Sequence, residues 1–153
     1  MIPVQKGNVF STGNMSKDAD EILALLTQIT QLTKNRKLEE LKPFISDSKG
    51  IYIDLKSWKS KEEFLEEVRK EDGYIDLYFY HTEKLSKEKG ELNVRTVRDL
   101  LILSEGLKVD FHFETNQACE IKLRFEKNNE YETELNNPYF IKENGNWYLY
   151  RLF

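Results

Sequence analysis

Apolar residues recur at helical spacing near the start of the chain. They follow the i, i+3, i+4, i+7 rule, which places them on one face of a helix. These residues are Ile22, Leu25, Leu26, Ile29 and Leu32. Asp18 is followed three residues later by Glu21, a spacing that fits a capping box at a helix N-terminus. The pattern therefore predicts an amphipathic helix over Asp18–Asn35.

Three shorter segments also have helical signals. Pro43 would end the first, and Ser60 with Glu63 would form a capping box at the start of the second. Asn93 can cap the third, whose inward side would carry Val97, Leu100 and Leu101. The predicted helices span Leu38–Lys42, Ser60–Lys70 and Val94–Ser104.

Two segments between these helices alternate apolar and polar residues, as a strand with one buried face does. In the first, Ile51, Ile53 and Leu55 alternate with Tyr52 and Asp54. The second is YIDLYFY, Tyr74–Tyr80. We expect both to be strands, and we expect the charged stretch His81–Glu91 to be a loop.

The next two alternating segments, LKVDFHFE and CEIKLRFE, predict an antiparallel hairpin. Matching their apolar faces sets the register, because a slip of one residue would turn every side chain over. The predicted pairs are Val109 with Phe125, Phe111 with Leu123, Phe113 with Ile121, Asp110 with Arg124, and His112 with Lys122.

Asn144-Gly145 predicts a tight turn between two final strands, Asn137–Lys142 and Asn146–Leu152. Both faces of this hairpin carry apolar or aromatic residues. One predicted face holds Phe140, Lys142, Trp147, Leu149 and Arg151, and the other holds Tyr139, Ile141, Tyr148, Tyr150 and Leu152. Each face therefore needs a cover, which would be a helix on one side and a concave sheet or a second subunit on the other.

Helices early in the chain and an antiparallel sheet late predict an α+β fold, with N-terminal helices packed on a curved sheet. Residues 1–15 are expected to be a loose leader and residues 16–153 a single domain. The leader lacks the pattern of a signal peptide, so a cytoplasmic protein is expected, and an exported form whose signal was removed is the alternative.

Composition narrows the possible functions. The formal net charge is −4, with Lys and Glu interspersed, which argues against a nucleic-acid surface. No apolar run is long enough to cross a bilayer. Cys119 is the single cysteine, so neither an intrachain disulfide nor a cysteine-rich metal site is expected. Motifs of serine hydrolases, phosphate-binding loops and zinc proteases are absent, and no cofactor is expected.

Two stretches carry a resemblance to a known fold family. FISDSKGIY, Phe44–Tyr52, is similar to a segment of uncharacterised bacterial proteins that end in a Gly-x-Trp-Tyr-Leu strand, here Gly145, Trp147, Tyr148 and Leu149. With the order of predicted elements, the chain resembles the nuclear-transport-factor-like and SnoaL-like proteins. This resemblance implies a cone-shaped, cystatin-like fold, which hosts isomerases, dehydratases, small-ligand binders and structural partners.

Tyrosines gather in the segments that would line the concave side of such a cone. The candidate ligand-binding residues are Tyr52, Tyr74, Tyr78, Tyr80, Tyr148 and Tyr150. Asp54 and Asp76 lie among them, and burial would raise the pKa of either carboxyl group toward that of a general base. A second candidate group, Asp110, His112 and Glu114, lies on one side of a strand, although a solvated polar face explains it better.

Two hypotheses follow from these residues. The first, which we favour, is a non-catalytic module that binds a small apolar ligand or a partner protein, including a second copy through the sheet. The alternative is a SnoaL-like proton-transfer enzyme of the isomerase or dehydratase type, with Asp54 or Asp76, or else His112, as the base. Neither hypothesis involves a metal.

Overall fold

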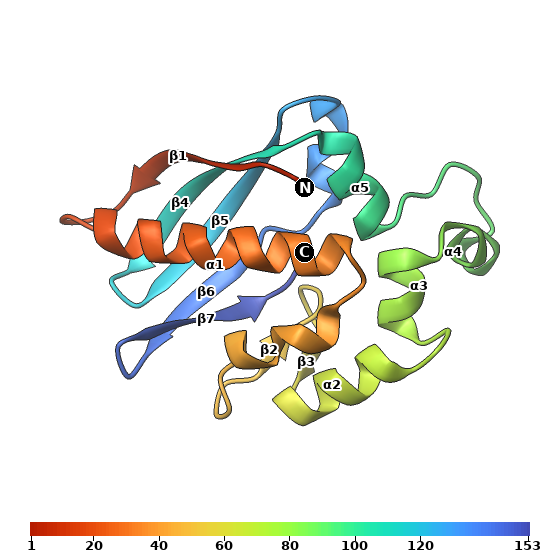
Figure 1. Ribbon diagram of the computed structural model, residues 1–153, viewed down its shortest axis with the longest axis horizontal. Coiled ribbons are helices and arrows are strands. Elements are labelled where there is room, and N and C mark those ends of the chain that lie inside the picture. The colour runs from red at the N-terminus through yellow and green to blue at the C-terminus, as the bar shows by residue number, and fades with distance from the viewer.

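A computed structural model describes residues 1–153 and shows an α+β protein, in which a long helix crosses one face of an open seven-stranded sheet (Figure 1). The helix is α1, Ser16–Lys34. The sheet is mainly antiparallel, but the β1–β4 and β2–β7 pairs are parallel. In spatial order the strands are β1 (Val4–Phe10), β4 (Leu107–Thr115), β5 (Ala118–Phe125), β6 (Tyr139–Glu143), β7 (Asn146–Arg151), β2 (Ile51–Tyr52) and β3 (Trp58–Lys59).

Helix α1 confirms the predicted amphipathic helix. Ile22, Leu26 and Ile29 are fully buried against the sheet, as the periodicity indicated. The predicted capping box is wrong, because Met15 is the N-cap and no side chain caps the helix. The Asp18 carboxylate instead accepts hydrogen bonds from Trp147 Nε1 at 2.9 Å and Lys142 Nζ at 3.0 Å. It therefore ties the start of α1 to the last hairpin.

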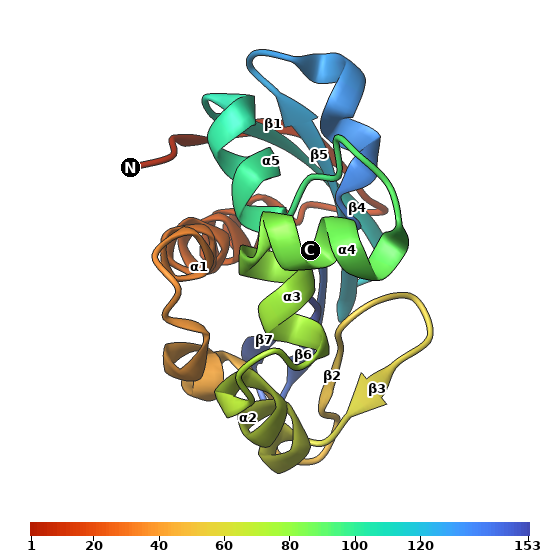
Figure 2. The same ribbon diagram turned by 90° about the vertical axis from the view of Figure 1, so that its right-hand side faces the viewer.

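The remaining helices gather at one end of the sheet, and Figure 2 views that end directly. They are η1 (Leu38–Phe44), α2 (Lys61–Arg69), α3 (Tyr74–Tyr80), α4 (Thr82–Lys89), α5 (Val97–Ser104) and η2 (Asn129–Glu134). The Ser60–Glu63 capping box is confirmed. The cap of α5 is Thr96, which forms its own capping box with Asp99, so the assignment of Asn93 is wrong. None of these helices has the length and apolar character needed to cross a bilayer.

The segment YIDLYFY forms α3 instead of the predicted strand. Ile75 and Phe79, four residues apart, are the two buried side chains, and this spacing suits a helical turn as well as an alternating strand. The charged stretch that follows is not a loop, because most of it forms α4. The strand expected from Ile51 is short, since the chain turns after Tyr52.

The segment expected as a loose leader contains β1, which pairs in parallel with β4 and forms an edge of the sheet. The pairing shifts register between Lys6 and Val9. The Asp110 side chain binds the backbone within this irregular stretch, because its Oδ1 accepts a hydrogen bond from the Asn8 backbone N–H at 2.8 Å.

The β4–β5 hairpin has the predicted faces in a different register. Phe111 pairs with Ile121, and Val109 pairs with Leu123, so the ladder is shifted by two residues from the predicted one. A shift of two leaves each side chain on the same face, and the apolar pattern cannot detect it. Asp110 now faces Lys122, yet it still pairs with Arg124, at 2.9 Å.

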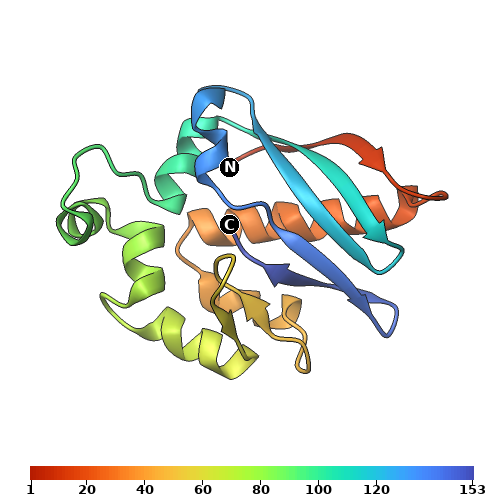
Figure 3. The ribbon, with the colours of Figure 1, turned by 180° about the vertical axis from the view of Figure 1, so that it is seen from behind.

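The hairpin of β6 and β7 around Asn144-Gly145 is confirmed, with Phe140, Trp147 and Leu149 buried. A register shift beside Tyr139 puts Arg151 opposite Tyr139, so Arg151 does not share the Phe140 face as predicted. Seen from behind, strands β4–β7 have no helix across them (Figure 3). We call this side, away from α1, the outer face of the sheet.

Candidate functional site

A partly enclosed cavity of about 410 Å³ lies where α3, α4 and α5 meet η2 and the segment after β2. We call it the interhelical pocket. Its volume is in the range of small-ligand sites, although its exposed lining is more polar than the mostly apolar walls that are typical of such sites. The floor is made of buried apolar side chains from six different segments. These are Ile53, Phe79, Leu85, Leu100, Leu135 and Phe153.

Two predicted tyrosines form one side of the rim. The rings of Tyr74 and Tyr78, one helical turn apart on α3, stack with their centroids 4.4 Å apart. The ammonium group of Lys89, at the end of α4, lies 5.2 Å from the centroid of the Tyr78 ring. This arrangement places a cation over an aromatic face at the entrance, a favourable contact that leaves the ammonium exposed.

Asp54 also lines the interhelical pocket, but both oxygens of its carboxylate already accept hydrogen bonds from neighbouring groups of the protein. Its Oδ1 accepts from the backbone N–H groups of Lys56 and Ser57, both at 2.7 Å, and its Oδ2 accepts from the Tyr74 hydroxyl at 3.0 Å. Burial alone would raise the pKa of Asp54, but these hydrogen bonds lower it below its ordinary value. The expected raised pKa is therefore wrong, and the geometry does not favour Asp54 as a general base.

The Tyr74 hydroxyl is held in the same contact. Burial and the hydrogen bond to Asp54 raise the pKa of Tyr74 to about 12, so the phenol stays protonated at neutral pH. The pair Asp54–Tyr74 links the turn after β2 to α3, and it fixes the aromatic rim in place.

The opposite side of the rim carries a neutralised charge. Arg95 donates two hydrogen bonds to the Glu134 carboxylate, from Nε at 3.0 Å and from Nη2 at 2.7 Å. Its guanidinium also lies 4.3 Å from the centroid of the Tyr131 ring. A bidentate pair of this kind is rigid. Arg95 therefore lines the pocket, but its charge is neutralised by Glu134 and is not available to a ligand.

Other predicted residues lie outside the interhelical pocket. Tyr80 and Asp76 border a separate depression beside η1, where the Tyr80 hydroxyl donates to the Thr33 carbonyl oxygen at 2.7 Å. The His81 Nε2 atom lies 3.0 Å from Asp76 Oδ2. Possible ligand atoms of Asp72, Asp76 and His81 lie within 4.8 Å of one another, but Lys84 is paired with Asp72 and its charge would oppose a cation.

The rest of the predicted tyrosines lie on the outer face, in β2 and β7. Tyr52 and Tyr150 meet edge to face with ring centroids 5.4 Å apart, and Tyr139 joins them at 6.3 Å from Tyr150. With Ile141 they border a shallow groove of about 330 Å³, and Tyr148 lies on the same side. The predicted set of six tyrosines therefore does not form one site, because α3 takes three of them to the helical end.

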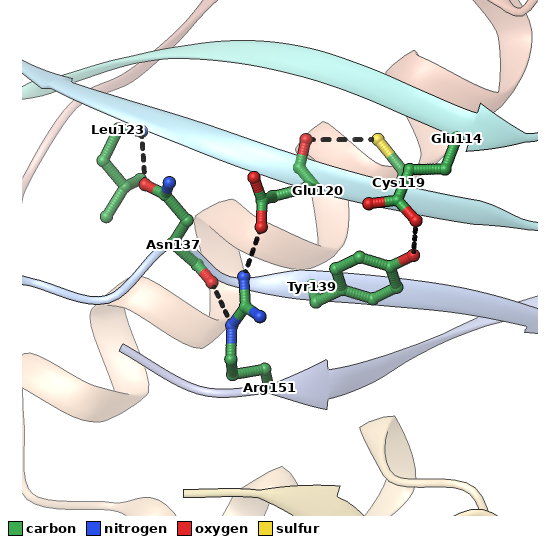
Figure 4. Close-up of polar contacts among 7 residues, drawn as sticks. All are labelled: Glu114, Cys119, Glu120, Leu123, Asn137, Tyr139 and Arg151. Atoms are coloured by element: carbon green, nitrogen blue, oxygen red, sulfur yellow. Dashed lines mark hydrogen bonds and ion pairs between the residues drawn. The ribbon is translucent and has the colours of Figure 1, made fainter. Parts of the chain in front are cut away.

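Polar groups beside this groove are already paired with one another, as Figure 4 shows. The Tyr139 hydroxyl donates to Glu114 Oε2 at 2.8 Å, which together with burial raises its pKa. Arg151 donates to Glu120 at 2.7 Å and to the Asn137 carbonyl oxygen at 2.7 Å. The groove offers an apolar surface but few free polar groups to select a ligand.

The second candidate group is also divided. Asp110 stabilises the β1–β4 junction, and Glu114 binds Tyr139, so neither faces His112 as a catalytic partner. The exposed His112 ring stacks on Phe10 with centroids 4.7 Å apart. Cys119 is fully buried, and burial raises the pKa of its thiol to about 12, so the thiol stays protonated and unreactive at neutral pH.

Sequence reasoning missed most of the pocket lining. Leu85 and Lys89 lie in the stretch predicted to be a loop, where one leucine among charged residues gives little helical signal. Leu135 lies in the polar connector before β6, and Phe153 follows the last strand. Only the packing of distant segments brings these side chains together.

Comparisons with known protein families, with curated proteins and with solved structures found no match to this chain. A relationship to the cone-shaped family therefore rests on the stretches Phe44–Tyr52 and Gly145–Leu149 and on the order of the elements.

Proposed function

We propose that the protein is a non-catalytic binding module that takes a small amphipathic ligand in the interhelical pocket. The observation that carries the proposal is the combination of buried apolar side chains at the base of the pocket with an open aromatic and charged rim. An apolar ligand body would cover the floor, and a polar part would stay at the rim, next to Tyr78 and Lys89. We further propose a cone-like fold for the chain, which the early long helix and the late antiparallel strands support.

The pocket carries no pair of groups suited to proton transfer. Asp54 is held as a carboxylate by four donors, including the Ser57 hydroxyl. Tyr74 is held as a phenol by the same contact. A site that binds without reacting is the simpler use of this arrangement.

The test is a titration with N-phenyl-1-naphthylamine, a neutral apolar dye whose fluorescence rises in an apolar site. Val94 lines the pocket from the segment before α5 and is only partly buried. Val94→Trp should fill the cavity without disturbing the core, and we expect it to weaken dye binding at least about tenfold. The expected fold-change reflects steric exclusion of the dye from the floor.

Leu92→Trp is the matched control, because Leu92 lies two residues earlier, is 87% exposed and does not line the pocket. This variant should bind the dye as the unchanged protein does. Circular dichroism checks that both variants fold. If the dye does not bind at all, or if folded Val94→Trp binds it normally, the proposed function is wrong.

A further inference from the structure

We infer that the ligand of the interhelical pocket is an amphipathic organic anion, and that Lys89 is the residue that selects its charge; this inference rests on the proposed function. The charged side chains of the rim are Asp54, Lys89, Glu91, Arg95 and Glu134. Their partners inside the chain decide which charges are left for a ligand.

Three of these five charges are satisfied within the protein. Asp54 is held by its own turn and by Tyr74, as described above. Arg95 and Glu134 neutralise each other through their bidentate contact. A ligand would have to break these contacts before it could use any of the three groups, and each broken contact would reduce its affinity.

Lys89 is the cation that remains. Its ammonium group forms no ion pair and no side-chain hydrogen bond within the chain, and its one described contact is with the Tyr78 ring. The ring cannot neutralise the ammonium, and it holds the ammonium at the edge of the apolar floor. An anionic group would bind this cation while the body of the same molecule covered the floor.

Glu91 is the remaining acid, two residues after Lys89, and it is exposed at the same rim. Its charge lowers the affinity for an anion and requires the anionic group to lie on the Tyr78 side of the entrance. Removal of this charge should therefore act in the opposite direction to removal of Lys89.

Two dyes with the same rings separate charge from apolar contact. N-phenyl-1-naphthylamine is neutral, whereas 8-anilinonaphthalene-1-sulfonate adds a sulfonate to the same body. Lys89→Gln should weaken binding of the sulfonate dye about two- to fivefold and leave the neutral dye unchanged, as expected for an exposed charge contact. Glu91→Gln should tighten binding of the sulfonate dye about twofold at low salt. Both effects should shrink at about 0.5 M salt, because dissolved ions screen exposed charges.

Lys87→Gln is the matched control, because it removes the same charge from the same helix at a position outside the pocket lining. It should leave both dyes unaffected. Equal effects of Lys89→Gln and Lys87→Gln, or equal effects of Lys89→Gln on both dyes, would overturn the inference. If Val94→Trp excludes both dyes but Lys89→Gln affects the binding of both dyes equally, the inferred charge of the ligand is wrong, and the pocket still binds an apolar molecule. If Val94→Trp excludes neither dye, the proposed function itself fails.

Discussion

Gly7 is the glycine at which an added side chain would meet the closest contact. A Cβ atom at this position would lie 2.2 Å from Asp110 Oδ1 and 2.8 Å from the Val109 carbonyl oxygen. Asp110 cannot move away without losing its hydrogen bonds to the Asn8 N–H and to Arg124. The absence of a side chain therefore lets β1 approach β4 closely enough for one carboxylate to hold both.

We predict that Gly7→Ala lowers the free energy of unfolding by about 1–3 kcal/mol, because overpacking forces the backbone or Asp110 to shift. Urea unfolding followed by circular dichroism measures the change. Asn8→Ala is the control: the Asn8 side chain is exposed, and its backbone N–H remains to bind Asp110. Equal stability of Gly7→Ala and the unchanged protein would show that β1 is not tightly placed.

Single residues also show where sequence reasoning stopped. Asp110 and Arg124 were predicted as a pair, and they do pair, although the predicted ladder was shifted by two residues. Arg151 was placed on the wrong face, because the register shift in the last hairpin leaves no mark in the sequence. Charge attraction reaches a diagonal neighbour, so a correct pair does not prove a correct register.

At the scale of elements, the long helix and the hairpins could be predicted because each has several periods of one pattern. The segment YIDLYFY could not, because it is only seven residues long and Ile75 with Phe79 fits both periods. Its neighbours decide the outcome: Phe79 forms part of the pocket floor, and Tyr74 reaches Asp54. Of the residues predicted for a site, only Asp54, Tyr74 and Tyr78 line the interhelical pocket, because they lie after β2 or on α3.

Helix α4 is the element with the weakest attachment near the pocket. It packs mainly against α3, and Leu85 is its one buried side chain. Helix α5 has the same length but buries Leu100, Leu101 and Ser104. Local opening costs less where fewer apolar contacts must be broken.

Hydrogen exchange measured by mass spectrometry should therefore show the α4 amides exchanging at least about tenfold faster than those of α5, the internal control of equal length. Amides in the middle of α1 should exchange last. Equal protection of α4 and α5 would contradict this description and would mean that α4 opens only when the whole domain unfolds.

At the scale of the whole molecule, carboxylates with lowered pKa connect parts that are distant in the sequence. Burial alone would raise the pKa of Asp18, but hydrogen bonds from Trp147 and Lys142 lower it, and they join α1 to the β6–β7 hairpin. Burial likewise opposes the lowered pKa of Asp99, which results from the Thr82 hydroxyl and the cap of α5. Such groups stabilise the fold above the unfolded pKa of about 3.9, and this stability is lost as the pH falls through the folded value.

We predict that Asp18→Asn lowers the free energy of unfolding by about 1–2 kcal/mol at pH 7, since the charge-assisted part of two hydrogen bonds is lost. The gap between variant and unchanged protein should narrow between pH 5 and about pH 2, as Asp18 itself becomes protonated. Chemical unfolding at several pH values measures the gap. Asp20→Asn, which removes an exposed carboxylate paired with Lys6, should change stability by less than about 1 kcal/mol. A gap that stays constant with pH would contradict the assigned role.

The two parallel strand pairs have a consequence for how the chain reaches this structure. Val4 pairs with Leu107, and Tyr52 pairs with Arg151, so each pair closes a loop of about a hundred residues. The ladders from β4 to β7 join neighbours in the chain and can form early, whereas both flanking strands must wait for them. A nucleus in this meander, followed by late docking of the two flanking strands, is the folding order that the topology favours.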